Sequence, residues 1–150
     1  MSNPTKLATE LNERRPLIVT KIARSLLCNR DEAVQALAEV IKFLAICAEQ
    51  EGGLATPSQR VDLAWHEFIL FTRCYAEFCN RVFGKMIHHE PGGQPETNAS
   101  QYCETLRRYA IHFGTPPESF WGTPGNALAS CGPCENSWSD HHVHVRDIVD

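Results

Sequence analysis

Apolar residues recur at intervals of three and four along most of the first 121 residues, which is the spacing of one face of an α-helix. The stretch 31–50 has an apolar face wide enough to predict a central, well-buried helix. Its apolar positions include Val34, Leu37, Val40, Ile41, Phe43, Leu44 and Cys47. No stretch alternates between apolar and polar residues as a strand does. The pattern therefore predicts an all-α protein, a compact bundle of about five helices.

Prolines and capping residues set the expected boundaries in the first third of the chain. Residues 1–15 are polar and mixed, and predict at most a short, frayed helix. Pro16 suits the first turn of a helix, and Asn29 or Asp31 can cap the next one. The five expected helices span about 16–28, 31–50, 57–69, 73–83 and 98–113.

Similar signals mark the later helices. Thr56 is expected to cap the third helix, with Gln59 completing a capping box. Thr72 can cap the fourth helix, and Gly84 is placed to end it. Asn98, three residues before Gln101, predicts a capping box for the fifth.

The composition changes near residue 122. Before it, a short turn is expected to present Phe120 and Trp121 to the core. Residues 122–150 are rich in Gly, Ser, Asn and His and show little periodicity. We therefore expect a helical domain over 1–121 and a loosely ordered, flexible tail containing Cys and His over 122–150.

The overall composition narrows the functional classes. Hydrophobic residues make up 43% of the chain and charged residues 21%, as in ordinary globular proteins. The net charge is −4 and no basic run occurs, so we expect no nucleic-acid partner. We find no membrane-span candidate and no signal peptide, and expect an intracellular, cytoplasmic protein. The seven cysteines are then more simply thiols or metal ligands than disulfides.

Asp62 and His66 are the first candidate site residues, because residues four apart share one face of a helix. Three interpretations fit this pair. Asp62 can orient the imidazole of His66 in a purely structural hydrogen bond. Both can bind a metal ion, since carboxylate and imidazole are ligands of zinc, iron and manganese. The pair can also act in general acid–base chemistry without a metal.

Further candidate ligands occur later in the chain. On one straight helix Cys79 would lie about 20 Å from His66, so a break near Thr72 is needed for them to meet. A bend there and the loop after the next helix would bring His88 or His89 back toward His66. Adjacent histidines usually point in different directions, so one of the two is expected to be a ligand.

An ordered set of residues runs through this part of the chain: Asp62, Trp65, His66, Thr72, Tyr75, Cys79, Gly84, His89 and Pro91. This set resembles the signature of the glycine-rich domain-containing protein family of bacteria and plants. The resemblance covers mainly residues 57–91, about a quarter of the chain. It implies a helical domain with these signature residues and no particular activity.

The chain departs from that family in two places. Many members carry a second histidine two residues after the Trp-His pair, whereas this chain has Phe68 there, which removes one potential metal ligand. Members also often end in a long tail rich in Gly and Cys. Here that tail is reduced to the segment 131–134, Cys-Gly-Pro-Cys, and the sixteen or so residues after it.

The tail itself allows several interpretations. Its Cys-Gly-Pro-Cys segment resembles the thioredoxin active-site motif, but too few residues remain for the strands of that fold. Two thiols and three imidazoles could alternatively bind zinc, although their spacing matches no standard zinc finger. The simplest interpretation is an unstructured tail with incidental Cys and His. The residues concerned are Cys131, Cys134, His141, His142 and His144.

These observations give two main hypotheses. The first is a small intracellular helical protein with a divalent-metal site for zinc or iron, with Asp62 as a ligand or as the residue that orients His66. The alternative is a non-catalytic module that binds a protein partner and in which the Asp–His pair only stiffens the helix packing. The expected metal ligands are Asp62, His66, Cys79 and His89, with His88 as a substitute, and the expected pocket residues are Trp65 and Tyr75.

Overall fold

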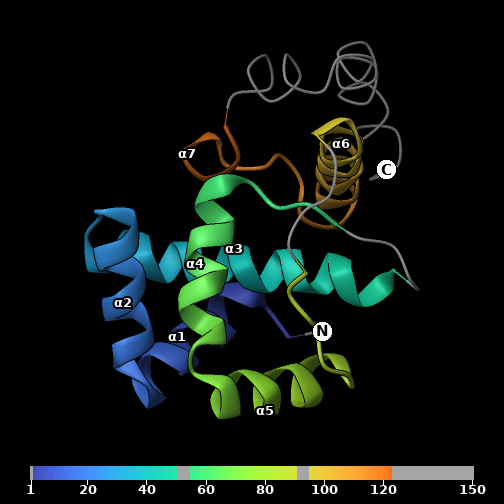
Figure 1. Cartoon of the computed structure of the whole chain (residues 1–150). Helices are drawn as coiled ribbons and strands as arrows, with labels where there is room; N and C mark the ends of the chain where they lie inside the picture. The colour runs from blue at the N-terminus through green and yellow to red at the C-terminus, as the bar shows by residue number, and fades with distance from the viewer. Residues whose placement is uncertain (1, 51–54, 91–94, 123–150) are drawn as a thin grey trace.

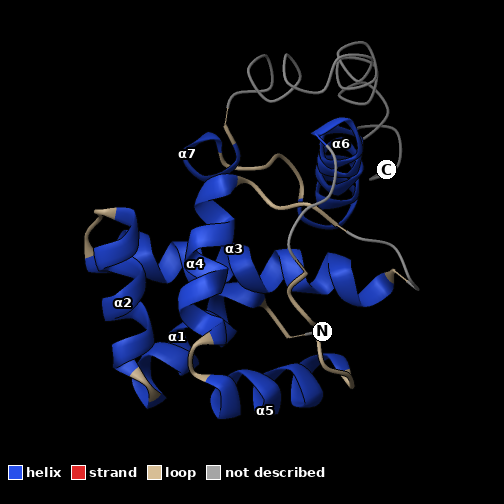
Figure 2. Ribbon diagram, in the orientation of Figure 1, coloured by secondary structure: helices blue, strands red, loops and turns tan. Residues whose placement is uncertain are grey.

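The computed structural model describes residues 2–50, 55–90 and 95–122 (Figure 1). Every regular element in these ranges is a helix and none is a strand (Figure 2), so the predicted all-α class is confirmed. No helix in the same ranges combines the length and apolar character needed to cross a bilayer. The helices are α1 (Pro4–Arg14), α2 (Pro16–Leu26), α3 (Arg30–Glu49), α4 (Gln59–Ile69), α5 (Thr72–Phe83), α6 (Pro95–Phe113) and α7 (Glu118–Trp121).

Helix α3 is the centre of the fold. It packs against α1, α2, α4 and α6, and Figure 1 shows it running across the molecule behind α4. It begins with a capping box in which the side chain of Asn29 and that of Glu32 each accept a hydrogen bond from the other's backbone N–H. Its buried residues are Ala33, Ala36, Leu37, Ala38, Glu39, Val40, Ile41, Phe43, Leu44 and Ile46. The prediction of a central, buried helix is thus confirmed.

The N-terminal residues form a full helix rather than a short, frayed one. Asn3 caps α1, which then packs on α3 through a narrow apolar stripe. Only three positions of this polar segment are buried, which is why its periodicity is weak. Arg30, at the start of α3, donates hydrogen bonds to Asn12 and to the backbone oxygen of Pro16, and so ties the first three helices together. The buried positions of α1 are Leu7, Ala8 and Leu11.

The caps of α4 and α5 differ from those expected. Ser58, not Thr56, caps α4, and its hydroxyl also donates a 2.6 Å hydrogen bond to the carbonyl of Phe120. Thr56 instead bonds across to Gln101 on α6. Thr72 is the first residue of α5 and makes no capping hydrogen bond there. The prediction for α4 named the wrong hydroxyl, because a tertiary partner holds the side chain of Thr56.

The end of the described chain closes over α3 and α4. Helix α6 begins at Pro95, three residues before the predicted start, and the short α7 lies at the start of α4 (Figure 1). As predicted, α7 buries Phe120 and Trp121. The ring of Trp121 contacts Phe43 of α3, with 6.5 Å between the ring centroids. Helix α7 thus covers the end of the core next to the candidate site on α4.

Candidate metal centre

Helix α4 presents Asp62 and His66 beside its buried stripe. The stripe anchors one face of the helix in the core, and the two polar residues lie one turn apart next to it. Their side chains are 31% and 47% exposed, so both groups reach solvent. The helix therefore fixes two metal-binding groups at the protein surface. The buried residues of the stripe are Val61, Ala64, Trp65 and Phe68.

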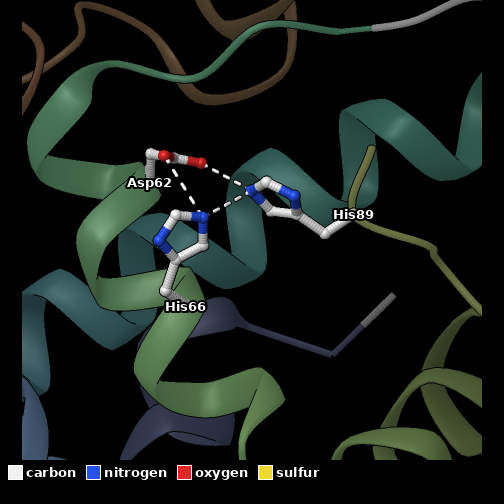
Figure 3. Close-up of side chains that lie close together, drawn as sticks. All are labelled: Asp62, His66 and His89. Carbon is white, nitrogen blue, oxygen red and sulfur yellow. Dashed lines mark hydrogen bonds and ion pairs between the residues drawn. The ribbon is translucent and has the colours of Figure 1, made fainter. Parts of the chain in front are cut away.

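The third group arrives from a different part of the chain. Helix α5 ends at Gly84, whose positive φ of 72° reverses the chain as a left-handed C-cap. The following non-helical residues return toward α4 and bring His89 to Asp62 and His66 (Figure 3). The sharp bend between α4 and α5, followed by this return, is the path that the sequence suggested.

The donor atoms of the three side chains converge. Nε2 of His89 lies 2.8 Å from Nε2 of His66 and 2.8 Å from Oδ1 of Asp62. The remaining contact, between Nε2 of His66 and Oδ2 of Asp62, is 3.4 Å. Figure 3 shows the two rings turning these nitrogens toward each other and toward the carboxylate. Within the described ranges, these three residues form a group whose geometry suits a metal ion.

Hydrogen bonds cannot satisfy all three contacts at once. A ring nitrogen in the plane of an imidazole carries either a hydrogen or a lone pair. If both Nε2 atoms carry hydrogens, two N–H groups face each other across 2.8 Å. If only one does, a lone pair of the other imidazole faces the carboxylate. A cation between the three atoms would instead use a lone pair from each, which is the bonding that a divalent metal requires.

The three residues lie in the wall of a cleft of about 750 Å³. Its other walls come from the end of α3, the start of α4, α6 and residues 85–90 after α5, which we name the return segment. Trp65, Met86 and Ile87 give it an apolar surface, while Lys85 and Glu90 add charges of opposite sign. The volume is within the usual range for small-molecule sites.

The model of the UCP032817-like family matches residues 9–113, which is more than half of the chain. The chain belongs to the UCP032817-like family. The matched region includes Asp62, His66 and His89. Searches of curated proteins and of solved structures found no match. The resemblance to glycine-rich domain-containing proteins is not part of this family's description and stays a prediction.

In this UCP032817-like chain, two of the five predicted ligands lie outside the cluster. His88 is exposed at the edge of the cleft, while its neighbour His89 turns inward. Cys79 is fully buried, and its sulfur lies beside Tyr75 and the backbone of Ile87. Burial raises the pKa of the Cys79 thiol, whereas metal binding needs a thiolate. The candidate ligands are thereby reduced to three.

The two predicted pocket residues have separate positions. The ring of Trp65 lines the cleft and packs on His89, with 4.4 Å between the ring centroids. Tyr75 is buried behind the cleft, and burial raises the pKa of its phenol well above the ordinary range. The predicted tail ligands Cys131, Cys134, His141, His142 and His144 fall outside the residues that the structure describes.

Sequence reasoning missed the buried carboxylate of Glu39 and the cleft residues around the return segment. Glu39 is 4% exposed and lies between two apolar neighbours on α3, and that lone charge on an apolar helix face was the available signal. No comparable signal marks Lys85, Met86 or Gln101, because only the tertiary fold brings them to one cleft.

Proposed function

We propose that this protein binds one divalent metal ion, zinc or iron, through Asp62, His66 and His89, and exposes that ion to the cleft. The convergence of three donor atoms within hydrogen-bonding distance of one another carries the proposal. Nothing else in the described chain gathers this combination of groups.

The donor set matches known metal chemistry. Two imidazoles and one carboxylate hold zinc in several hydrolases, and the same combination holds iron(II) in non-haem oxygenases. A tetrahedral zinc ion with bonds of about 2.0–2.1 Å would place its ligand atoms about 3.3 Å apart. The contacts of 2.8, 2.8 and 3.4 Å therefore need only small ring movements to accept an ion.

Three protein ligands leave at least one coordination position free, and the exposure of the cluster directs that position toward the cleft. When bound, the ion would act there as a Lewis acid toward a small ligand. The protein supplies an apolar wall in Trp65 and Ile87 and two charges in Lys85 and Glu90 to hold such a ligand.

The alternative, a structural Asp–His pair in a protein-interaction module, agrees less well with the burial. The side chain of His66 is 47% exposed, and ion pairs at such positions contribute roughly 0–1 kcal/mol to stability. A pair that stiffened the core would be expected deeper in it. The two hypotheses differ in what the loss of His66 removes, which is metal in one case and stability in the other.

Elemental analysis tests the proposal in the full chain. Because the tail contains potential ligands of its own, the experiment uses a tail-silent background that keeps the chain length. The substitutions that define this background are Cys131→Ser, Cys134→Ser, His141→Ala, His142→Ala and His144→Ala.

We expect near-stoichiometric zinc or iron in the tail-silent protein and its loss in His66→Ala. His112→Ala is the matched control, because His112 is similarly exposed and also paired with a carboxylate, that of Glu49. It should keep the metal. Equal metal content in all three proteins, or none in any of them, would reject the proposal, and loss of stability alone in His66→Ala would favour the structural pair.

A further inference from the structure

We propose that Tyr75 is a positioning residue that holds His89 at the metal centre without touching the metal, an inference that rests on the proposed function. The phenol oxygen of Tyr75 accepts a 3.0 Å hydrogen bond from the indole N–H of Trp65. It donates a 2.6 Å hydrogen bond to the carbonyl of Ile87. Ile87 is two residues before His89, so the phenol fixes the backbone from which that imidazole projects.

Cys79 lies beside the same residue. Its thiol is close enough to the backbone of Ile87 and to Tyr75 for both to lower its pKa, against the larger effect of burial. Tyr75, Cys79 and Ile87 are all buried, so the hydrogen bonds of the phenol do not compete with water. We name this set, Trp65, Tyr75, Cys79 and Ile87, the return latch.

The latch joins the third ligand to the helix that carries the other two. Trp65 lies on α4 between Asp62 and His66, and its ring packs against that of His89 while its N–H reaches Tyr75. Phe43 of α3 also packs against the indole, at 5.2 Å between centroids. The side chain of Trp65 thus contacts His89 directly and also contacts Tyr75, which holds the backbone at Ile87.

Few hydrogen bonds hold the return segment. Among the described residues, positions 85–90 make no backbone-to-backbone hydrogen bond with any helix. Its polar contacts with α4 and α5 are those of the latch and of the cluster of ligands, and its apolar contacts are made by Ile87 and Met86 with the core. Without the phenol hydroxyl, His89 would sample positions from which its Nε2 misses Asp62 and His66. Groups that orient metal ligands typically contribute about 10–100-fold to metal affinity.

The decisive comparison is between Tyr75→Phe and Tyr109→Phe in the tail-silent background. Each removes one hydroxyl from a buried tyrosine that both accepts and donates hydrogen bonds, Tyr109 doing so with Lys42 and Glu39. Tyr109 is not part of the cleft, so its variant controls for the general cost of losing a buried hydroxyl. Zinc affinity is measured by competition with a chelating dye, beside the His66→Ala variant.

We expect Tyr75→Phe to bind zinc at least about ten-fold more weakly than the tail-silent protein, and Tyr109→Phe to bind it equally well. An unchanged affinity in Tyr75→Phe, with binding abolished in His66→Ala, would overturn the latch and leave the metal site standing. If the tail-silent protein itself bound zinc no better than His66→Ala, the proposed function would fail instead.

A second measurement tests the latch in the metal-free protein. The rings of His66 and His89 lie 4.5 Å apart between centroids, close enough for a proton–proton Overhauser effect between them by NMR. This signal should persist in Tyr109→Phe and be lost in Tyr75→Phe. Its persistence in Tyr75→Phe would overturn the inference whether or not any metal binds.

Discussion

The indole N–H of Trp121 donates a 2.8 Å hydrogen bond to the carboxylate of Glu39, although the two residues are 82 positions apart in the chain. The same oxygen of Glu39 accepts a hydrogen bond from Tyr109, and its other oxygen pairs with Lys42 at 2.7 Å. One buried carboxylate therefore joins α3 to both α6 and α7. None of Glu39, Tyr109 and Trp121 lines the cleft beside the candidate site.

The first prediction concerns that carboxylate. Glu39→Ala should lower the free energy of unfolding by about 3–5 kcal/mol, because it leaves the cation of Lys42 and two buried donors without their acceptor. Denaturant unfolding followed by circular dichroism measures the loss. Glu49→Ala is the control, since among the described residues Glu49 pairs with His112 at an exposed position, and its loss should cost under about 1 kcal/mol. Equal losses would show that the buried network adds nothing.

The second prediction separates the observed caps from the expected ones. Ser58→Ala should destabilise the fold by about 1–2 kcal/mol, because it removes the cap of α4 and leaves the carbonyl of Phe120 without its donor. Thr72→Ala should change stability by less than about 0.5 kcal/mol, since Thr72 is exposed and caps nothing. Thermal melts of the two variants give the comparison. The reverse order would mean that α5, not α4, depends on its hydroxyl.

The third prediction concerns alkaline pH. Burial is the main cause that raises the pKa of both Tyr75 and Tyr109 far above the ordinary value of about 10. Above that value the unfolded chain loses phenol protons that the folded protein retains, so stability should fall as the pH rises, by about 1.4 kcal/mol per pH unit for each phenol. Below it the contribution is fully present.

Unfolding by urea at several pH values between about 9 and 11 measures this slope. Tyr109→Phe removes one of the two phenols. The decline in stability should then be shallower by about 1.4 kcal/mol per pH unit. An unchanged slope in that variant would show that Tyr109 ionises equally readily in the folded and unfolded states.

The fourth prediction distinguishes the two adjacent histidines. Zinc at about 100 times its dissociation constant should stabilise the tail-silent protein by about 2.7 kcal/mol, since the ion binds the folded state preferentially. His89→Ala should abolish this stabilisation, whereas His88→Ala should retain it because His88 is outside the cluster. Melting temperatures with and without zinc provide the readout. Retained stabilisation in His89→Ala would remove that residue from the ligand set.

Much of the fold was predictable because the periodicity of apolar residues and the residues that end helices indicate it directly. The apolar face of α3, the end of α5 at Gly84 and the burial of Trp121 all arise from patterns within a few residues. Some predictions that were wrong involve competition at longer range. Thr56 has the right type and spacing for a cap, yet Gln101, 45 positions away, holds its hydroxyl. Local sequence carries no information about such a partner.

In the candidate site, too, local spacing was predictable from the sequence and long-range contacts were not. The spacing of Asp62 and His66 places them on one face of a helix, and this requires no tertiary information. The choice of His89 over His88 depends on the backbone at Ile87, which is set by a phenol from α5. Cys79 was predicted as a ligand because of its residue type, but its position on α5 turns the sulfur into the core behind the cleft.

The division of the ligands between a core helix and a short return segment has a kinetic consequence. An ion held by this cluster would lose one of its three ligands when His89 moves outward from the buried Ile87, while α4 and the core stay folded. Local openings of this kind cost less free energy than global unfolding and occur far more often. Release of the proposed ion would therefore need only a local opening of this segment and not the unfolding of the protein.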